Sequence, residues 1–231
     1  MSRADEFIDL YKRLEDAAVQ RYNYPTDGRA VLRLQDRREF SSVRSELSYC
    51  REVRNLLQHK PKLDGQFLVQ PSEEMLQFLR GMLHRIEHPV RCRDVAIPFE
   101  KMYWKTMADP VLPAVRVLKN AIHTHIPILE DRRVVGIFTV NGLFNHLVDK
   151  GEGGFAETTL FSDMGEFLRL DNHPSEVYLF ARADTPLDEL EESFQSARET
   201  GRRVGMVFLT HGGKATEKVL GILTAWDMIG Q

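Results

Sequence analysis

The sequence predicts an α+β protein in which a three-helix bundle, residues 1–89, precedes two β-α-β-β-α repeats, at about 90–150 and 160–231. Three observations support this prediction. Apolar residues recur every three or four positions up to about residue 88, which is typical of amphipathic helices. Beyond that point the apolar segments become short and rich in branched and aromatic residues, as strands are. Finally, one order of segments occurs twice, which indicates an internal repeat over residues 90–231.

The helices of the first part are expected at residues 3–22, at 36–58 and from Ser72 to just before Pro89. Ser72 suits a helix start because its hydroxyl can accept a hydrogen bond from a free backbone N–H group. Pro61 disfavours continuation of the second helix because its ring restricts the preceding residue. The apolar stripes that define the helices consist of Phe7, Leu10, Leu14 and Ala18, then Phe40, Val43, Leu47, Cys50, Val53 and Leu57, then Leu76, Leu79, Leu83 and Ile86.

The repeat is recognised from matching segments in matching order. Each copy contains an aromatic run expected as a strand, a helix, a second strand and a third strand that ends in Gly-φ-φ-Thr, where φ is apolar. The matching pairs are 102–104 with 177–180, 111–118 with 187–194, 125–129 with 204–208, and 134–139 with 219–224. The second copy is longer mostly in the 211–218 turn, where an insertion costs little.

The last strand of the second copy leads directly into a helix start, Thr224-Ala225-Trp226-Asp227. The free N–H groups and positive dipole end of a helix start suit a phosphate, and a nearby carboxylate can accept from ribose hydroxyls. Thr-x-x-Asp is also an ordinary capping pair, in which each side chain satisfies backbone N–H groups. Both interpretations remain open from these residues alone.

The repeated order and both Gly-φ-φ-Thr endings make residues 90–230 resemble a pair of CBS domains. The resemblance implies a pseudo-symmetric module that binds an adenine nucleotide (AMP, ADP or ATP) in a cleft between the repeats. In the family's Gly-φ-x-Thr/Ser-x-x-Asp motif the hydroxyl residue serves the phosphates and the acid serves the ribose. Gly221, Thr224 and Asp227 match this motif fully, whereas the first copy has Gly142 in place of the acid. One nucleotide site is therefore expected rather than two.

The resemblance implies further contacts with the nucleotide. Adenine in this family lies against the first strand of a repeat, which makes Phe180, Ala181 and Arg182 candidates. His125, Arg202 and Arg203 lie just before a second strand, where the family often keeps a phosphate partner. A solvated basic face explains the same cations equally well.

The second helix carries polar residues near its end, Arg54, Asn55 and His59. Arg54 falls within the apolar stripe of Cys50 and Leu57, where an arginine is costly unless it is paired or faces water. An arginine that holds a phosphate and a histidine that carries a proton near neutral pH suit RNA phosphodiester cleavage. The alternative is a histidine that caps the helix end and an arginine that pairs with a carboxylate, Glu46 or Glu52.

Residues 47–59 resemble the Arg-x4–6-His motif of the HEPN families of helical bundles. That resemblance implies a homodimer with the motif at the dimer cleft and, in many members, a metal-independent endoribonuclease. His59 would then act as general acid or base, Arg54 would hold the phosphate and Asn55 would orient it. Other HEPN-like bundles are not nucleases, so a bundle that only dimerises or docks a partner is the alternative.

Composition narrows the class of protein. The formal net charge of −3 over 231 residues gives no overall attraction to nucleic acid. Cys50 and Cys92 lie far apart and are expected as reduced thiols in the cytoplasm. No apolar run approaches the roughly 18 residues of a membrane helix, so no membrane partner is expected. His123 and His125 lack a third ligand nearby, and no metal is expected.

Three functions fit these observations. The first is a cytosolic sensor whose nucleotide-binding pair regulates a helical dimer, which acts on RNA. The second is a non-catalytic nucleotide-sensing module whose bundle dimerises or docks a partner. The third is a structural protein with a vestigial pocket, for which Thr224 and Asp227 would be incidental.

Overall fold

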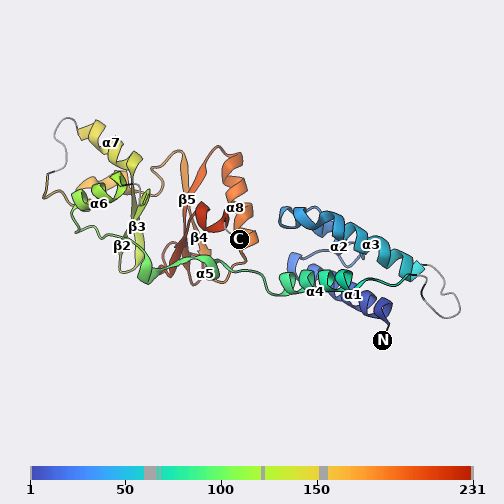
Figure 1. Cartoon of the computed structure of the whole chain (residues 1–231). Helices are drawn as coiled ribbons and strands as arrows, with labels where there is room; N and C mark the ends of the chain where they lie inside the picture. Colours follow the sequence, from blue (N-terminus) through green and yellow to red (C-terminus); the bar gives the residue numbers. More distant parts are fainter. Residues whose placement is uncertain (1, 60–66, 68, 121–122, 151–155, 230–231) are drawn as a thin grey trace. The chain divides into compact units, whose positions relative to one another are not determined.

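The computed structural model describes residues 2–59, 67, 69–120, 123–150 and 156–229. The chain divides into two compact units, Met1–Pro89 and Val90–Gln231 (Figure 1). The first unit is helical and the second mixes helices with strands, which confirms the α+β prediction. Over the described residues, no helix has both the length and the apolar character needed to cross a membrane.

The first unit is built around its first helix, α1, which contacts α2, α3 and α4. Its described elements are α1 (Arg3–Tyr22), α2 (Ala30–Leu34), the 3-10 helix η1 (Arg38–Val43), α3 (Arg44–His59) and α4 (Glu73–Glu87). Helices α1, α3 and α4 lie where the apolar periodicity predicted helices. The fully buried side chains Phe7, Leu14, Leu47, Leu76 and Leu79 belong to one core.

Local sequence explains where these helices begin and end. The Ser2 hydroxyl oxygen accepts a hydrogen bond from the Asp5 N–H group at 3.1 Å, and Ser72 does the same for Met75 at 3.3 Å. Asn23 ends α1 in the left-handed conformation, with φ of 52°.

The expected helix at 36–58 differs in its first turns, which form η1. Helix α2 was not predicted, because five residues are too few to show a helical period. The break predicted at Pro61 lies outside the described residues.

Among its described residues, the second unit contains two separate sheets, one of four strands in the order β1-β6-β5-β4 and one of β2 and β3. Strands β4 and β5 are parallel, and the other neighbours are antiparallel. The strands are β1 (Ile97–Pro98), β2 (His125–Glu130), β3 (Arg133–Thr139), β4 (Glu176–Arg182), β5 (Arg203–Thr210) and β6 (Gly221–Leu223). The helices are α5 (Cys92–Val95), η2 (Phe99–Lys101), α6 (Val111–Lys119), α7 (Val140–Lys150), η3 (Phe161–Leu168), α8 (Leu187–Glu199) and α9 (Ala225–Ile229).

The two sheets share one apolar core, to which Leu129 and Ile137 contribute from one sheet and Met206, Phe208 and Ile222 from the other. Two further cores pack α6 against β2 and β3, and α8 against β4, β5 and β6. Figure 1 shows α6 and α7 beside the smaller sheet and α8 beside the larger one. Each sheet thus has helices packed beside it, and the core between the sheets joins the repeats.

The repeat is confirmed, and it extends further than the sequence comparison found. Arg91 bridges to Pro186 at the start of α8, and Leu160 bridges to Pro110 at the start of α6. In each copy the bridging residue donates its N–H group to a carboxylate three positions on, Asp94 or Asp163, at 2.9 Å. The leading segment of each repeat thus packs on the other repeat.

Two expected strands differ in the structure. The aromatic run 102–104 is not a strand, because η2 immediately before it turns the chain. A single parallel bridge, Lys105 to Ile128, takes the place of the expected pairing. Strand β6 is shorter than the predicted 219–224, because the Val219 N–H group bonds the Arg132 carbonyl in the other repeat at 2.8 Å.

Candidate functional site

The junction between β6 and α9 holds the predicted Thr-x-x-Asp pair. The backbone N–H group and the hydroxyl of Thr224 both donate to Oδ2 of Asp227, at 2.7 and 2.8 Å. The two residues therefore form a capping pair at this helix start. Both are half-buried, and among the described residues no donor is bonded to Oδ1 of Asp227. That oxygen can accept a hydrogen bond from a ligand while the cap stays intact.

The matching junction of the first repeat is closed. Thr139 is buried, and its hydroxyl oxygen accepts from the Gly142 N–H group at 3.0 Å. A Cβ atom added at Gly142 would lie 2.9 Å from the Phe167 carbonyl oxygen and 3.8 Å from Cε1 of His173. An aspartate side chain has no room there. This packing gives a physical reason for the missing acid.

The glycine of each Gly-φ-φ-Thr ending has a steric role. A Cβ atom at Gly221 would lie 2.7 Å from the carbonyl oxygen of Ile97 in β1. At Gly136 it would lie 2.9 Å from Cβ of Leu168, in the segment that leads the other repeat. Glycine at both positions therefore lets a neighbouring segment approach closely. Gly221 was predicted as a nucleotide contact, and the structure gives it this packing role.

The strand register separates the predicted nucleotide contacts into two groups. Leu179, Val207 and Leu223 lie in one row across β4, β5 and β6. Thr224 follows Leu223 toward the end of the sheet at which β4 and β5 begin, the end that carries Arg203. Phe180, Ala181 and Arg182 extend from that row in the opposite direction. Arg182 is three residues from Leu179, or about 10 Å along the strand at 3.3 Å per residue.

The three residues at the far end are also engaged by the protein. The Phe180 ring stacks on that of Phe208, with 5.2 Å between ring centres. Ala181 is half-buried against the core of the second repeat. Arg182 pairs with Asp184 at 3.2 Å on the surface. The structure thus brings Thr224, Asp227 and Arg203 to one end of the sheet and leaves Phe180 to Arg182 at the other.

At the near end lies a buried carboxylate that the sequence analysis missed, Glu176, whose side chain is only 2% exposed. Nε2 of His125 and the Tyr178 hydroxyl contact its Oε2 at 3.0 and 2.7 Å, and Nε of Arg203 donates to its Oε1 at 2.8 Å. Burial alone would raise the pKa of Glu176, but the bonds from His125, Tyr178 and Arg203 outweigh it and lower the pKa to about 2. Glu176 is therefore ionised at neutral pH.

Glu176 changes how the two predicted phosphate partners are interpreted. His125 comes from the first repeat and Arg203 from the second, so the carboxylate joins the repeats. Burial and the bond to Glu176 also raise the pKa of Tyr178, which keeps that hydroxyl protonated as a donor. The Arg203 side chain is 70% exposed and its planar guanidinium keeps outward N–H groups. Arg203 can contact an anion in solvent without leaving Glu176.

In the helical unit, Arg54 and Asn55 contact each other, since the Arg54 guanidinium donates to Oδ1 of Asn55 at 3.2 Å. Arg54 also lies over the Tyr11 ring, with 5.8 Å from its guanidinium carbon to the ring centre. The pairing predicted as an alternative, with Glu46 or Glu52, is not present among the described residues. The His59 side chain lies outside the described part of the chain.

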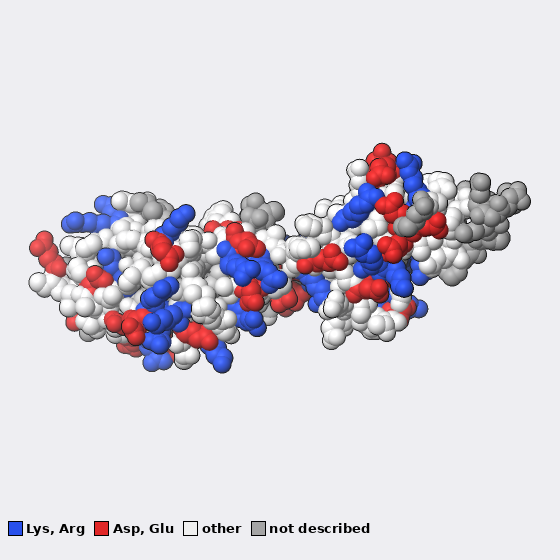
Figure 2. Space-filling model, turned by 90° about the horizontal axis from the view of Figure 1, so that it is seen from below, with Lys and Arg blue, Asp and Glu red and all other residues white. Residues whose placement is uncertain are grey.

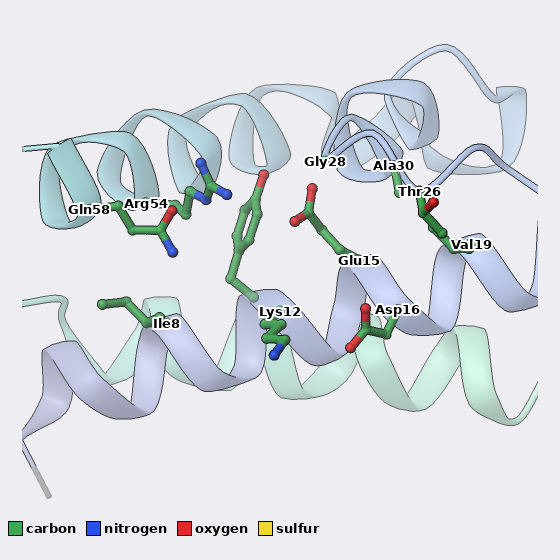
Figure 3. Close-up of a pocket in the computed structure, with 11 residues that line it drawn as sticks. Ile8, Lys12, Glu15, Asp16, Val19, Thr26, Gly28, Ala30, Arg54 and Gln58 are labelled. Atoms are coloured by element: carbon green, nitrogen blue, oxygen red, sulfur yellow. The ribbon is translucent and has the colours of Figure 1, made fainter.

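The Arg54 side chain borders a pocket of about 260 Å³ between α1 and α3 (Figure 3). The pocket carries both signs of charge, and its lining residues are Ile8, Tyr11, Lys12, Glu15, Asp16, Val19, Thr26, Gly28, Ala30, Arg54 and Gln58. On the face drawn in Figure 2, basic and acidic side chains are interspersed. Neither the pocket nor that face carries charge of one sign.

The remaining predictions concern sulfur and metals. Cys50 and Cys92 are both buried free thiols, as expected. Burial raises the pKa of the Cys50 thiol to about 12, so that thiol stays protonated and unreactive at neutral pH. The described residues contain no group of three or more His, Cys, Asp or Glu side chains arranged to hold a metal ion.

Comparisons with known proteins found matches among solved structures alone. Searches of protein-family models and of curated proteins gave no match. A putative acetoin utilization protein, AcuB, from Vibrio cholerae is 13% identical, with 62% of this chain and 89% of that chain covered and a TM-score of 0.44. CBSX2 in complex with AMP is 20% identical, with 61% and 93% covered and a TM-score of 0.41.

A third neighbour is the CBS domain pair of protein MJ0100, in complex with 5′-methylthioadenosine and S-adenosyl-L-methionine. It is 17% identical, with 62% of this chain and 94% of that chain covered and a TM-score of 0.41. The structural neighbours of this chain thus include CBS-domain pair proteins, which match about three fifths of its length.

Proposed function

We propose that residues 90–231 form a CBS pair that senses an adenine nucleotide through a single site, at the junction of β6 and α9. The observation that supports this proposal is the difference between the two junctions of the repeat. Asp227 keeps one carboxylate oxygen available beside the Thr224 cap, whereas Phe167 fills the corresponding space at Gly142. One junction can hold a ribose and the other is packed.

Each residue at the open junction has a role in this proposal. Oδ1 of Asp227 accepts from a ribose hydroxyl, the first turn of α9 faces the phosphates, and Thr224 holds the Asp227 carboxylate in place through Oδ2. Arg203, at the same end of the sheet, supplies a cation that Glu176 orients. Phe180, Ala181 and Arg182 lie too far along the strand to share this position, so they contribute only if the base extends toward them.

The proposed regulation follows from the contacts between the repeats. A nucleotide that contacts Arg203 also acts on the carboxylate that holds His125 of the other repeat. If the ligand binds one arrangement of the repeats more tightly than another, it shifts their populations and so controls the helical unit. We propose a non-catalytic sensor as the core function, in which the bundle dimerises or docks a partner.

The ribonuclease hypothesis for the bundle stays a prediction. Arg54 is positioned beside Asn55, but Glu15 and Asp16 line the same pocket and would repel a phosphate. RNA cleavage without added metal, compared between the wild type, Arg54→Ala and His59→Ala, tests it directly. Cleavage that survives both substitutions would end the ribonuclease assignment.

Sedimentation of the full chain tests the predicted homodimer, and a strict monomer would contradict a composite dimer cleft.

The sensor proposal is tested by calorimetric titration of AMP, ADP and ATP into the wild type and Asp227→Asn. Asparagine keeps an acceptor for the Thr224 cap and removes the charge. We expect nucleotide affinity to fall about ten- to hundred-fold, because a hydrogen bond to a charged group contributes about 1.5–3 kcal/mol. Asp163→Asn is the matched control, since Asp163 caps η3 in the same way. Equal affinity in all three proteins would remove Asp227 from the site.

A further inference from the structure

The pocket between α1 and α3 has features that neither a nucleotide sensor nor a packed bundle requires. Figure 3 shows the Glu15 and Arg54 side chains projecting into the space between the two helices, and Tyr11 also lines this pocket. Its volume of about 260 Å³ is a little below the roughly 300–1,000 Å³ of pockets for drug-sized ligands. The pocket therefore has the size for a ligand much smaller than a nucleotide.

Glu15 is the first of two side chains in this pocket whose hydrogen-bonding capacity is not filled by the described residues. Its Oε1 atom is buried and has no hydrogen-bond partner among the described residues. Burial raises the pKa of Glu15, and the charge of Arg54 opposes that effect only in part. Buried carboxylates are normally paired, because an unsatisfied one forfeits its hydration. A ligand group that donates hydrogen bonds, and above all an ammonium, would supply the missing partner.

Arg54 is the second group. Its guanidinium carries five N–H donors, and its described contacts are a 3.2 Å bond to the neighbouring Asn55 and the face of the Tyr11 ring. Arg54 thus has more donors than its described contacts satisfy, and a carboxylate is the group that matches a guanidinium best.

The side chains that line the pocket include as many basic groups as acidic ones. Lys12 and Arg54 are basic, and Glu15 and Asp16 are acidic. A free anion such as a phosphate would meet two carboxylates, and a simple cation would meet two basic groups. A molecule with both charges, separated as Glu15 on α1 and Arg54 on α3 are separated, would satisfy each side.

We propose that this pocket binds a small zwitterion of the amino-acid class, with its ammonium at Glu15 and its carboxylate at Arg54. Tyr11 also lines the pocket, and its hydroxyl can contribute a further donor or acceptor. Thr26, Gly28 and Ala30, which have small side chains, also line the pocket. The bundle would then carry a ligand site of its own, independent of the nucleotide site.

The test measures melting temperature and then binding enthalpy for the full chain with each common free amino acid at millimolar concentration. Acetate and methylammonium serve as the two halves of the ligand. We expect at least one amino acid to raise the melting temperature and neither half to do so at the same concentration. Failure of every amino acid would overturn the proposal, and an equal effect of acetate alone would reduce the pocket to a simple anion site.

Two substitutions locate the binding. Glu15→Gln and Arg54→Gln should each weaken the amino acid at least about tenfold, because each removes one charged partner. Glu52→Gln and Arg13→Gln change exposed residues on the same two helices and should leave affinity unchanged. Glu15→Gln should fold at least as stably as the wild type, since it removes the charge from a half-buried carboxylate whose Oε1 atom has no partner among the described residues. Unchanged affinity in Glu15→Gln would contradict the proposed orientation and the site.

Discussion

Glu176→Gln is expected to weaken the second unit in a way that depends on pH. The pKa of Glu176 falls from its usual value near 4.5 to about 2 in the folded protein. At 1.36 kcal/mol per pKa unit, the ionised form contributes about 3 kcal/mol to the free energy of unfolding at pH 7. Because the folded pKa is depressed, this stability is fully present above about pH 4.5 and is lost as pH falls toward 2.

The prediction is checked by urea unfolding of the wild type and Glu176→Gln at pH 7, 4 and 3. The difference in unfolding free energy should be about 3 kcal/mol at pH 7 and about half of that at pH 3. Asp171→Asn is the control, because Asp171 pairs with Arg169 on the surface, where such pairs contribute little. A Glu176→Gln protein as stable as the wild type at pH 7, or a difference that does not change with pH, would refute this account of the cluster.

Three further substitutions test the packing. Gly221→Ala should destabilise the second unit by about 1–3 kcal/mol, because its Cβ would lie 2.7 Å from the Ile97 carbonyl oxygen. Urea unfolding measures this change, and an unchanged free energy of unfolding would show that β1 moves freely. Ser72→Ala should cost about 1 kcal/mol in thermal unfolding through loss of the α4 cap, with Ser72→Asp restoring most of it. Leu79→Ala should cost about 2–5 kcal/mol by the same measurement, and a change below 1 kcal/mol would contradict its full burial.

Much of the fold followed from local patterns. The apolar periodicity located α1, α3 and α4 because each is long enough to show several turns. The repeat could be predicted because matching segments occur in the same order. The Thr224–Asp227 cap could be predicted because the two residues are three positions apart. Short elements were missed where tertiary contacts decide: α2 has five residues, and residues 102–104 are held by a single bridge at Lys105 rather than by a strand ladder.

The candidate site was only partly predictable, because its geometry depends on contacts between distant segments. Glu176 looks like any acid at the start of a strand, and only the approach of His125 from the other repeat reveals its role. The steric reason for Gly142 requires Phe167, which is 25 residues further along the chain. Likewise, no spacing rule places Arg54 and Glu15 in one pocket, because they come from different helices.

The measurement that tests the central claim most directly is the stoichiometry of adenine-nucleotide binding to the full chain. A calorimetric titration should give one nucleotide per chain, since Asp227 is accessible and the Gly142 junction is filled. Asp227→Asn should weaken that single binding event, and Asp163→Asn should leave it intact. Two equivalent nucleotides per chain, or a single one whose affinity does not depend on Asp227, would contradict the account.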